Sequence, residues 1–200
     1  MFNFFVYRKF RSKIWGNMSV ASRIEALQKM ENIEAKRCGR DCLEIEIANF
    51  GPNLLGRCEF NSKKILINES LLTTPHMQYL ALLVLFHEGR HAYQYSVISS
   101  ASHPWRFSKA YKWKQNMENY MHYDGSGKFS YYSMQEVERD TNLYSLNRLK
   151  SLHFWFRNED IYYTTIELKL KEMEEQKILA KKELGIFYKW KVNREISKKK

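Results

Sequence analysis

The chain has few cysteines, prolines and glycines, and it has no long apolar run. Its 200 residues include three cysteines, three prolines and eight glycines. An odd, low cysteine count without a Cys-x-x-Cys pair excludes a disulfide framework and favours a reduced compartment. So little proline and glycine excludes long linkers. The longest apolar stretch, residues 77–86, includes Gln78 and is too short to span a bilayer. We therefore expect a helix-rich, globular, cytoplasmic protein.

Two of the three cysteines lie four residues apart. Cys38 and Cys42 have a spacing that half of a zinc site can have, but nothing downstream completes such a site. We therefore expect two ordinary buried thiols.

Positive charge is concentrated at the two ends of the chain. Of the net charge of +11, residues 1–23 supply +5 (five bases, no acid) and residues 169–200 supply +6 (eleven bases, five acids). Aromatic residues are interleaved with the bases in Tyr7–Trp15 and in Tyr188–Lys191, which suits contact with nucleic acid or with an anionic membrane surface. Tails that only improve solubility are the alternative. The chain then divides into a basic aromatic segment (1–18), a main domain (19–157) and a basic C-terminal helical extension (158–200).

The periodicity of the apolar residues predicts helices around a short sheet, and the fold class is therefore α+β. Residues 43–47 alternate with period two, and 56–60 and 63–68 are two further predicted strands, joined at Asn61-Ser62. We expect these strands to form a short, mainly antiparallel sheet. Helices are predicted over 19–37, ended by Cys38-Gly39, over 75–98, in part of 105–122, over 133–156, and over 161–184, ended by Gly185.

The sequence His87-Glu88-Gly89-Arg90-His91 lies in the helix predicted over 75–98, for which Thr74 and Pro75 suit the N-cap and the first helical position. Side chains at positions i and i+4 project from adjacent turns of one face, so both imidazoles can bind one zinc ion. Glu88 lies about 100° further round the helix. There its carboxylate can take a proton from a metal-activated water and pass it to the leaving amine. This chemistry is typical of a zinc metallopeptidase of the zincin class.

The two histidines lie on the same face of the predicted helix as several apolar residues. The stripe consists of Leu80, Val84, His87, His91 and Tyr95. We therefore expect both imidazoles to point into the core. The alternative is a pair of core histidines without a metal, each of which needs a hydrogen-bond partner.

A catalytic zinc requires three protein ligands and one open position. Gln94 and Val97 stand where the metzincin motif requires Gly and His, which excludes a third histidine ligand from this helix. A carboxylate from a later helix is needed instead. Glu138 is favoured, because gluzincin-type helices commonly have a small residue three positions after the ligand and Asn or Asp four positions after it. Thr141 and Asn142 meet both requirements.

Two neighbouring acids are alternative ligands. Glu136 has the bulky Arg139 at the packing position, but Asp140 follows it by four residues. Asp140 itself has a shorter side chain, and it can instead hold a ligating imidazole by a hydrogen bond. If none of the three acids binds metal, they form a solvated helix face.

Three segments support a family resemblance: the strand Lys64–Asn68, the motif segment Phe86–Gln94, and Gln135-x-x-Glu138-x-Asp140-x-Asn142-x-Tyr144. Together they resemble the ImmA/IrrE-like metallopeptidases of bacteria, phages and conjugative elements. These enzymes share a strand, an HExxH helix and a downstream E-x-E/D-A-N-x-F/Y-A helix. The resemblance covers about residues 43–150. Thr141 and Ser145 differ from the family, which usually has Ala at both positions.

The resemblance implies a minimal zincin core, in which a third-ligand helix lies beside the HExxH helix, and it implies Zn2+ as cofactor. It further implies that this hydrolase is a site-specific endopeptidase in the cytoplasm. The substrate it implies is a partner protein such as a repressor-type regulator, encoded near the enzyme on a mobile genetic element.

A zincin also needs a group that stabilises the oxyanion of the transition state. Four residues from the irregular segment are candidates: Tyr131, Tyr132, His122 and His103. His76 and His153 do not look catalytic.

Two other functions are consistent with the sequence. One is a regulatory module on a zincin scaffold that has lost turnover, against which the intact Glu88 argues. The other is a nucleic-acid or membrane-surface protein that works through its basic ends.

Overall fold

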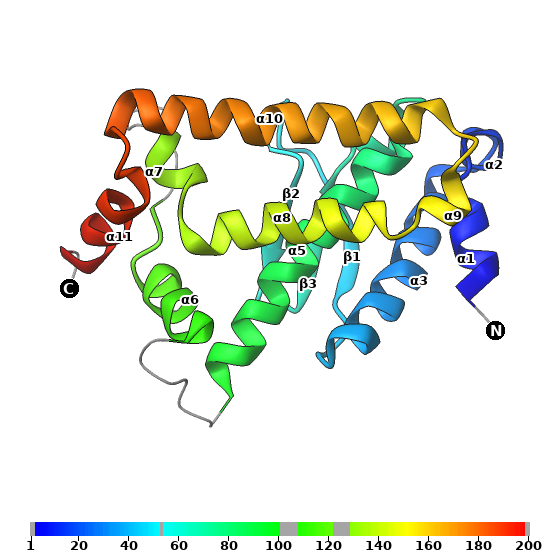
Figure 1. Cartoon of the computed structure of the whole chain (residues 1–200). Coiled ribbons are helices and arrows are strands. Elements are labelled where there is room, and N and C mark those ends of the chain that lie inside the picture. Colours follow the sequence, from blue (N-terminus) through cyan, green and yellow to red (C-terminus); the bar gives the residue numbers. More distant parts are fainter. Residues whose placement is uncertain (1–2, 53, 101–107, 122–128, 199–200) are drawn as a thin grey trace.

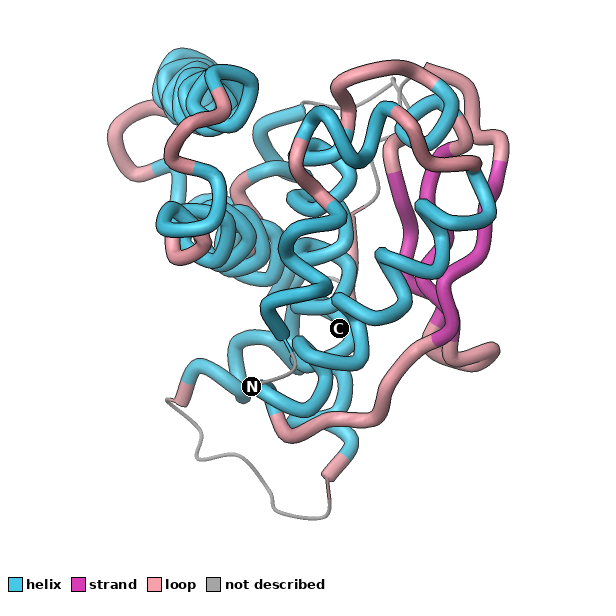
Figure 2. The backbone as a smooth tube through the Cα atoms, turned by 90° about the vertical axis from the view of Figure 1, so that its right-hand side faces the viewer, coloured by secondary structure: helices cyan, strands magenta, loops and turns pink. Residues whose placement is uncertain are grey.

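The computed structural model describes residues 3–52, 54–100, 108–121 and 129–198. Helices lie on one side of a small sheet, so the fold is α+β, as predicted (Figures 1 and 2). Helix α5 (Gln78–Ser99) contacts the sheet on one side and α8 (Glu136–Lys150) on the other. The long helix α10 (Asp160–Leu184) runs along the top of the molecule in Figure 1. In the described part of the chain, no helix has both the length and the apolar character needed to cross a membrane.

The sheet is mixed, and the prediction of a mainly antiparallel sheet is wrong. Its strands β1 (Glu44–Ala48), β2 (Gly56–Glu59) and β3 (Lys64–Asn68) have the order β1-β3-β2. β2 and β3 form the predicted antiparallel hairpin, but β1 pairs with the other edge of β3 and runs parallel to it. The chain reverses its direction after β1 and again after β2, so the first and third strands point the same way. Alternation alone does not tell which strand lies in the middle.

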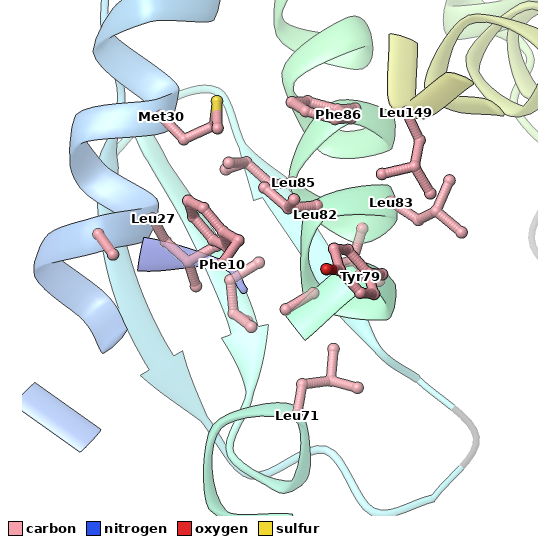
Figure 3. Packing of buried hydrophobic residues seen from close by; sticks show 14 of the residues in the cluster. Phe10, Leu27, Met30, Leu71, Tyr79, Leu82, Leu83, Leu85, Phe86 and Leu149 are labelled. Carbon is pink, nitrogen blue, oxygen red and sulfur yellow. The ribbon is translucent and has the colours of Figure 1, made fainter. Parts of the chain in front are cut away.

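Helix α5 is the centre of the fold. Its first half is apolar on every side, and Tyr79 and Leu82 are fully buried. Figure 3 shows Leu82 in one cluster with Leu27 and Met30 of α3 (Val20–Cys38). Helix α3 ends where predicted, because Gly39 takes up a left-handed φ of 66° that closes the last turn.

Helix α5 begins at Gln78 and not at residue 75. Thr74 and Pro75 instead follow the short helix α4 (Ser70–Thr73), and His76 has a φ of 63°. A left-handed residue does not fit inside a right-handed helix, so α5 starts after it.

The remaining helices agree with the predictions in part. The helix predicted over 161–184 is confirmed as α10, and the helix predicted in 105–122 is α6 (Lys109–Glu118). The single helix predicted over 133–156 is wrong, because a turn at residues 151–152 separates α8 from α9 (His153–Phe156). The prediction also lacked α7 (Phe129–Ser133).

Both ends of the chain pack onto the rest of the molecule. At the N-terminal end, Phe10 follows helix α1 (Asn3–Lys9) and Trp15 lies in helix α2 (Ser12–Gly16). Both side chains are fully buried in the main core. At the other end, α11 (Tyr188–Lys198) forms a second, smaller apolar cluster with the end of α10. Figure 1 shows α1 and α11 at opposite sides of the molecule.

A buried ion pair holds the end of α3 against the motif helix. The side chains of Glu31 and Arg40 are 0% and 2% exposed, and Arg40 Nη2 donates to Glu31 Oε2 over 2.8 Å. Gly89, in the middle of the motif, makes room for this pair, because a Cβ at that position would lie 2.7 Å from Arg40 Nη2. The glycine of the motif therefore has a packing reason.

We expect Glu31→Ala to lower the free energy of unfolding by about 3–5 kcal/mol, because Arg40 would stay buried without its counter-charge. The matched control is Glu25→Ala on the same helix. The pair of Glu25 with Lys29 is exposed, so its loss should have no measurable effect. Urea unfolding followed by circular dichroism measures both variants, and wild-type stability of Glu31→Ala would contradict the role given to the ion pair.

Candidate metal centre

The motif histidines lie in the second half of α5, which α8 crosses (Figure 1). The side chains of His87 and His91 are 19% and 12% exposed, and Tyr95 on the same stripe is 39% exposed. Both imidazoles are therefore mostly buried, in agreement with the prediction that they point into the core, whereas Tyr95 at the end of the stripe is exposed. From His87 onward the stripe borders solvent. The first half of α5 is apolar all round, so its pattern does not distinguish a core face from a site face.

Three side chains converge where the two helices cross. His87 Nε2 lies 3.4 Å from Glu138 Oε2, and His91 Nε2 lies 3.2 Å from Glu138 Oε1. The ligand atoms of all three residues lie within 4.8 Å of one another. Glu138 reaches this point from the first turn of α8, and its side chain is only 2% exposed. Among the described residues, this is the one group of three or more His, Cys, Asp or Glu that could hold a metal ion.

The spacing of these atoms fits one zinc ion. Zinc binds imidazole nitrogen and carboxylate oxygen at about 2.0–2.2 Å in tetrahedral geometry, which separates neighbouring ligand atoms by roughly 3.3 Å. The two nitrogen–oxygen distances, 3.4 and 3.2 Å, lie on either side of this value. Two imidazoles also favour zinc over the hard cations Mg2+ and Ca2+, which prefer oxygen ligands.

The charges of the site favour a cation as well. Burial by itself raises the pKa of the Glu138 carboxyl, but His91 and His87 outweigh burial and hold that pKa well below its usual range. Burial likewise lowers the pKa of His91, but the facing Glu138 carboxylate reverses the effect and raises that pKa to about 9. A buried carboxylate of this kind requires a positive partner. A proton on His91 or a metal ion between the three side chains supplies one.

Neighbouring polar groups position the three side chains. Gln94 is fully buried, and its Oε1 lies 3.0 Å from His91 Nδ1. This contact leaves His91 Nε2 directed at Glu138, since the two ring nitrogens have different partners. The hydroxyl of Tyr120 donates to Glu138 Oε1. Sequence reasoning missed the roles of Gln94 and Tyr120. Gln94 lies three residues after His91 on the same helix, and this spacing could have identified it. Nothing in the position of Tyr120 along the chain connects it with the motif.

The close approach of α8 depends on small residues. Thr141 is fully buried, its hydroxyl donates to the Glu138 carbonyl over 2.8 Å, and its Oγ1 lies 3.3 Å from His87 Nε2. Ser145, one turn later, is also buried. The positions that the sequence assigned to helix packing therefore lie at the helix contact, although neither is alanine.

The alternative ligands of α8 have other partners. Glu136 forms an ion pair with Arg139 at 3.0 Å. Asp140 accepts from Arg90 Nε at 2.7 Å and from Gln94 Nε2 at 3.0 Å. Asp140 thus reaches His91 only through Gln94, and not directly as the sequence suggested. Asn142 is buried on α8, and its carbonyl accepts from Ser145 Oγ at 3.1 Å.

Glu88 lies beside the start of β2, and it is half-buried. A Cβ on Gly56, the first residue of β2, would lie 3.4 Å from Glu88 Cγ and 2.4 Å from Val84 Cγ1. The missing side chain of Gly56 therefore lets β2 approach the motif helix beside Glu88. Burial raises the pKa of the Cys58 thiol on the same strand, and the charge of Glu88 adds to this effect.

One of the four candidates for oxyanion stabilisation lies at the site. Tyr132 is close to Tyr120, with ring centroids 6.1 Å apart, and burial together with the Glu138 charge raises its pKa. Tyr131 instead packs against the second apolar cluster near α11. His122 and His103 lie outside the described residues.

The remaining histidines and cysteines lie elsewhere. His76 is an exposed residue of the turn before α5, and His153 Nδ1 lies 3.3 Å from Tyr163 OH. The prediction of two buried thiols is wrong, because Cys42 is exposed and Cys38 is half-buried. Cys38 Sγ lies 3.1 Å from Tyr144 OH, and Cys42 Sγ donates to Asn32 Oδ1 at 2.7 Å.

Comparisons with known proteins identify no relative of this chain. No protein-family model, no curated protein and no solved structure matches the chain. The resemblance to the ImmA/IrrE-like enzymes therefore stays a prediction.

We expect purified wild-type protein to bind about one zinc per chain. His87→Ala, His91→Ala and Glu138→Ala should each lose this zinc, because two remaining ligands hold the ion too weakly. Glu136→Ala is the matched control, two residues from Glu138 on the same helix turn, and it should bind zinc like the wild type. Elemental analysis after dialysis measures the content. Loss of zinc in Glu136→Ala with full zinc in Glu138→Ala would show that the third ligand is misassigned.

Gln94→Leu should lower zinc affinity by about 10–100-fold, because His91 would lose the hydrogen bond that orients its ring. Competition with a chromophoric chelator measures the affinity. Gln115→Leu serves as control, since the Gln115 side chain donates to Tyr111 OH on α6 and does not touch the site. Unchanged affinity in a folded Gln94→Leu variant would contradict this positioning role.

Proposed function

We propose that this chain is a zinc-dependent endopeptidase. The observation that carries the proposal is the convergence of His87, His91 and the buried Glu138, with Glu88 next to His87 on the motif helix. Three protein ligands leave a fourth tetrahedral position free for a water or a substrate. This arrangement favours catalysis over a purely structural zinc, which is usually held by four protein ligands.

Zinc held by these three residues would act as a Lewis acid on the peptide carbonyl and would lower the pKa of a bound water to about 7. Glu88 acts as the general base. Its carboxylate accepts a proton from the attacking water and then donates it to the leaving amine. The half-buried position of Glu88 beside the start of β2 supports this role.

Tyr132 is our candidate for stabilising the oxyanion. A phenol is protonated at neutral pH, and burial together with the Glu138 charge raises the pKa of Tyr132 further, so its hydroxyl can donate a hydrogen bond to a developing negative charge. The hydroxyl of Tyr120 is already engaged with Glu138. We therefore assign Tyr120 to positioning the carboxylate.

An extended peptide suits the edge of the sheet next to Glu88. In the strand order β1-β3-β2, β2 pairs with β3 on one side only among the described strands. A peptide that adds to the other edge of β2 would gain main-chain hydrogen bonds. It would also pass Glu88, because Gly56 at the start of β2 lies against that side chain. We propose a flexible segment of a cytoplasmic protein as substrate, and the family resemblance favours a repressor-type regulator.

A zincin scaffold that binds a partner without cleaving it is the second candidate. Intact Glu88 supports turnover, since binding alone does not require a carboxylate at this position. Activity of the wild type decides between the two candidates.

Glu88→Gln should retain about one zinc per chain and lose at least about 100-fold in kcat/KM, because an amide cannot accept the proton. A library of quenched fluorescent peptides provides the substrate, and elemental analysis provides the zinc content. Glu44→Gln is the control, because Glu44 is exposed on β1, at the edge of the sheet opposite β2. Cleavage by Glu88→Gln at the wild-type rate would refute the general base. If the zinc-loaded wild type cleaves no peptide and no protein, the second candidate replaces the first.

A further inference from the structure

The corner between α10 and α11 exposes three large apolar side chains. Ile186, Phe187 and Trp190 are 79%, 68% and 58% exposed. They lie within five positions of the chain, directly after Gly185, whose φ of 79° ends α10. Single exposed apolar residues are normal on soluble proteins, but a contiguous exposed group marks an interaction site.

The corner is held in place by the opposite face of α11. Tyr188, Val192 and Ile196 are buried against Leu184 and Met134, in the second apolar cluster. Trp190 lies on the other face of this helix and points away from the molecule. Helix α11 thus has one apolar face that docks onto the protein and apolar residues at its start that have no such contact. The packing of this chain explains why the docked face is apolar, but it does not explain the exposed apolar residues.

The exposed charges around the corner are all positive. Between residues 181 and 196, the exposed charged side chains are Lys181, Lys182, Lys189, Lys191 and Arg194. The two acids of this stretch, Glu183 and Glu195, are half-buried and already have partners. The ammonium group of Lys191 lies 4.0 Å from the position of a Cβ on Gly185, so it belongs to the corner itself. The surface therefore combines exposed apolar side chains with exposed basic side chains from the same stretch of the chain.

We propose that this corner docks on an anionic membrane surface. Lysine and arginine are attracted to anionic headgroups, while exposed aliphatic and aromatic tips enter the boundary between headgroups and acyl chains. Tryptophan is also enriched at that boundary. The contact is peripheral, because the apolar group is short and lies at a helix corner. It does not depend on the proposed peptidase activity.

Two observations favour lipid over nucleic acid. Ile186 is the most exposed of the three, and an aliphatic tip has no stacking surface to offer a base. The guanidinium carbon of Arg194 lies 5.2 Å from the centroid of the Trp190 ring, so it covers one face of the indole. A lipid boundary accepts both features.

The test is co-sedimentation of the full chain with vesicles. One set of vesicles is phosphatidylcholine alone, and the other is equal parts of phosphatidylcholine and phosphatidylglycerol. The wild type should bind the anionic vesicles but not the neutral ones, and added salt should weaken the binding. Lys189→Gln with Lys191→Gln should lower the partition coefficient by roughly thirtyfold. Phe187→Ser with Trp190→Ser should lower it by at least about tenfold.

The matched control is Leu168→Ser with Leu170→Ser. These two apolar residues are 63% and 43% exposed on α10, away from the corner, and their loss should leave vesicle binding unchanged. Zinc content and circular dichroism show that each variant is folded, so a failure here is distinct from a failure of the peptidase proposal.

Three outcomes would overturn the proposal. The first is equal binding of neutral and anionic vesicles, or no binding of either. The second is tight binding of an RNA or DNA fragment that the Phe187/Trp190 variant loses, while vesicles are not bound. The third is self-association that the same variant abolishes, which would assign the corner to a second copy of the chain.

Discussion

The packing of α8 across α5 is the contact around which the fold is organised. It buries the Glu138 carboxylate between two imidazoles, at 3.4 and 3.2 Å. A buried carboxylate without a positive partner is strongly destabilising. The helix crossing is therefore tied to the charge at the site, either a proton or a metal ion. Thr141 makes the approach possible, since a larger side chain at this fully buried position would hold α8 away from the motif helix.

Two groups of charged side chains hold helix α5 at neighbouring positions of the motif, Gly89 and Arg90. On the α3 side, Gly89 leaves room for the buried pair of Glu31 and Arg40. On the α8 side, Arg90 pairs with Asp140, and its guanidinium lies 4.5 Å from the ring of Tyr93 and 4.7 Å from that of Tyr144. The residues between the motif histidines thus fix the helix in the fold. The histidines themselves remain free to bind an ion.

The proposed site residues and the excess of positive charge lie in different parts of the chain. Residues 24–168, which include every proposed site residue, contain seventeen bases and seventeen acids, so the net charge of +11 belongs to the two ends. A site next to the β2 edge, in the part of the chain without net charge, suits a peptide backbone. A basic corner at α11 suits an anionic surface. Together, the two proposals describe a peptidase that cleaves proteins while it is held at a membrane.

Features that depend only on residues near one another in the chain were predictable from the sequence. His87 and His91 share a face because four residues make about one helical turn, and Gly39 and Gly185 end their helices by local backbone conformation. The position of Glu138 was also predictable, since the small Thr141 and Ser145 mark the packing side of α8. Only the folded structure shows the mixed strand order, the hydrogen bond from Gln94 to Asp140, and the contact of Tyr120 with Glu138. These features join residues far apart in the chain, and they depend on how whole elements dock. Docking reflects the sum of many weak packing contacts, and no single spacing along the chain encodes that sum.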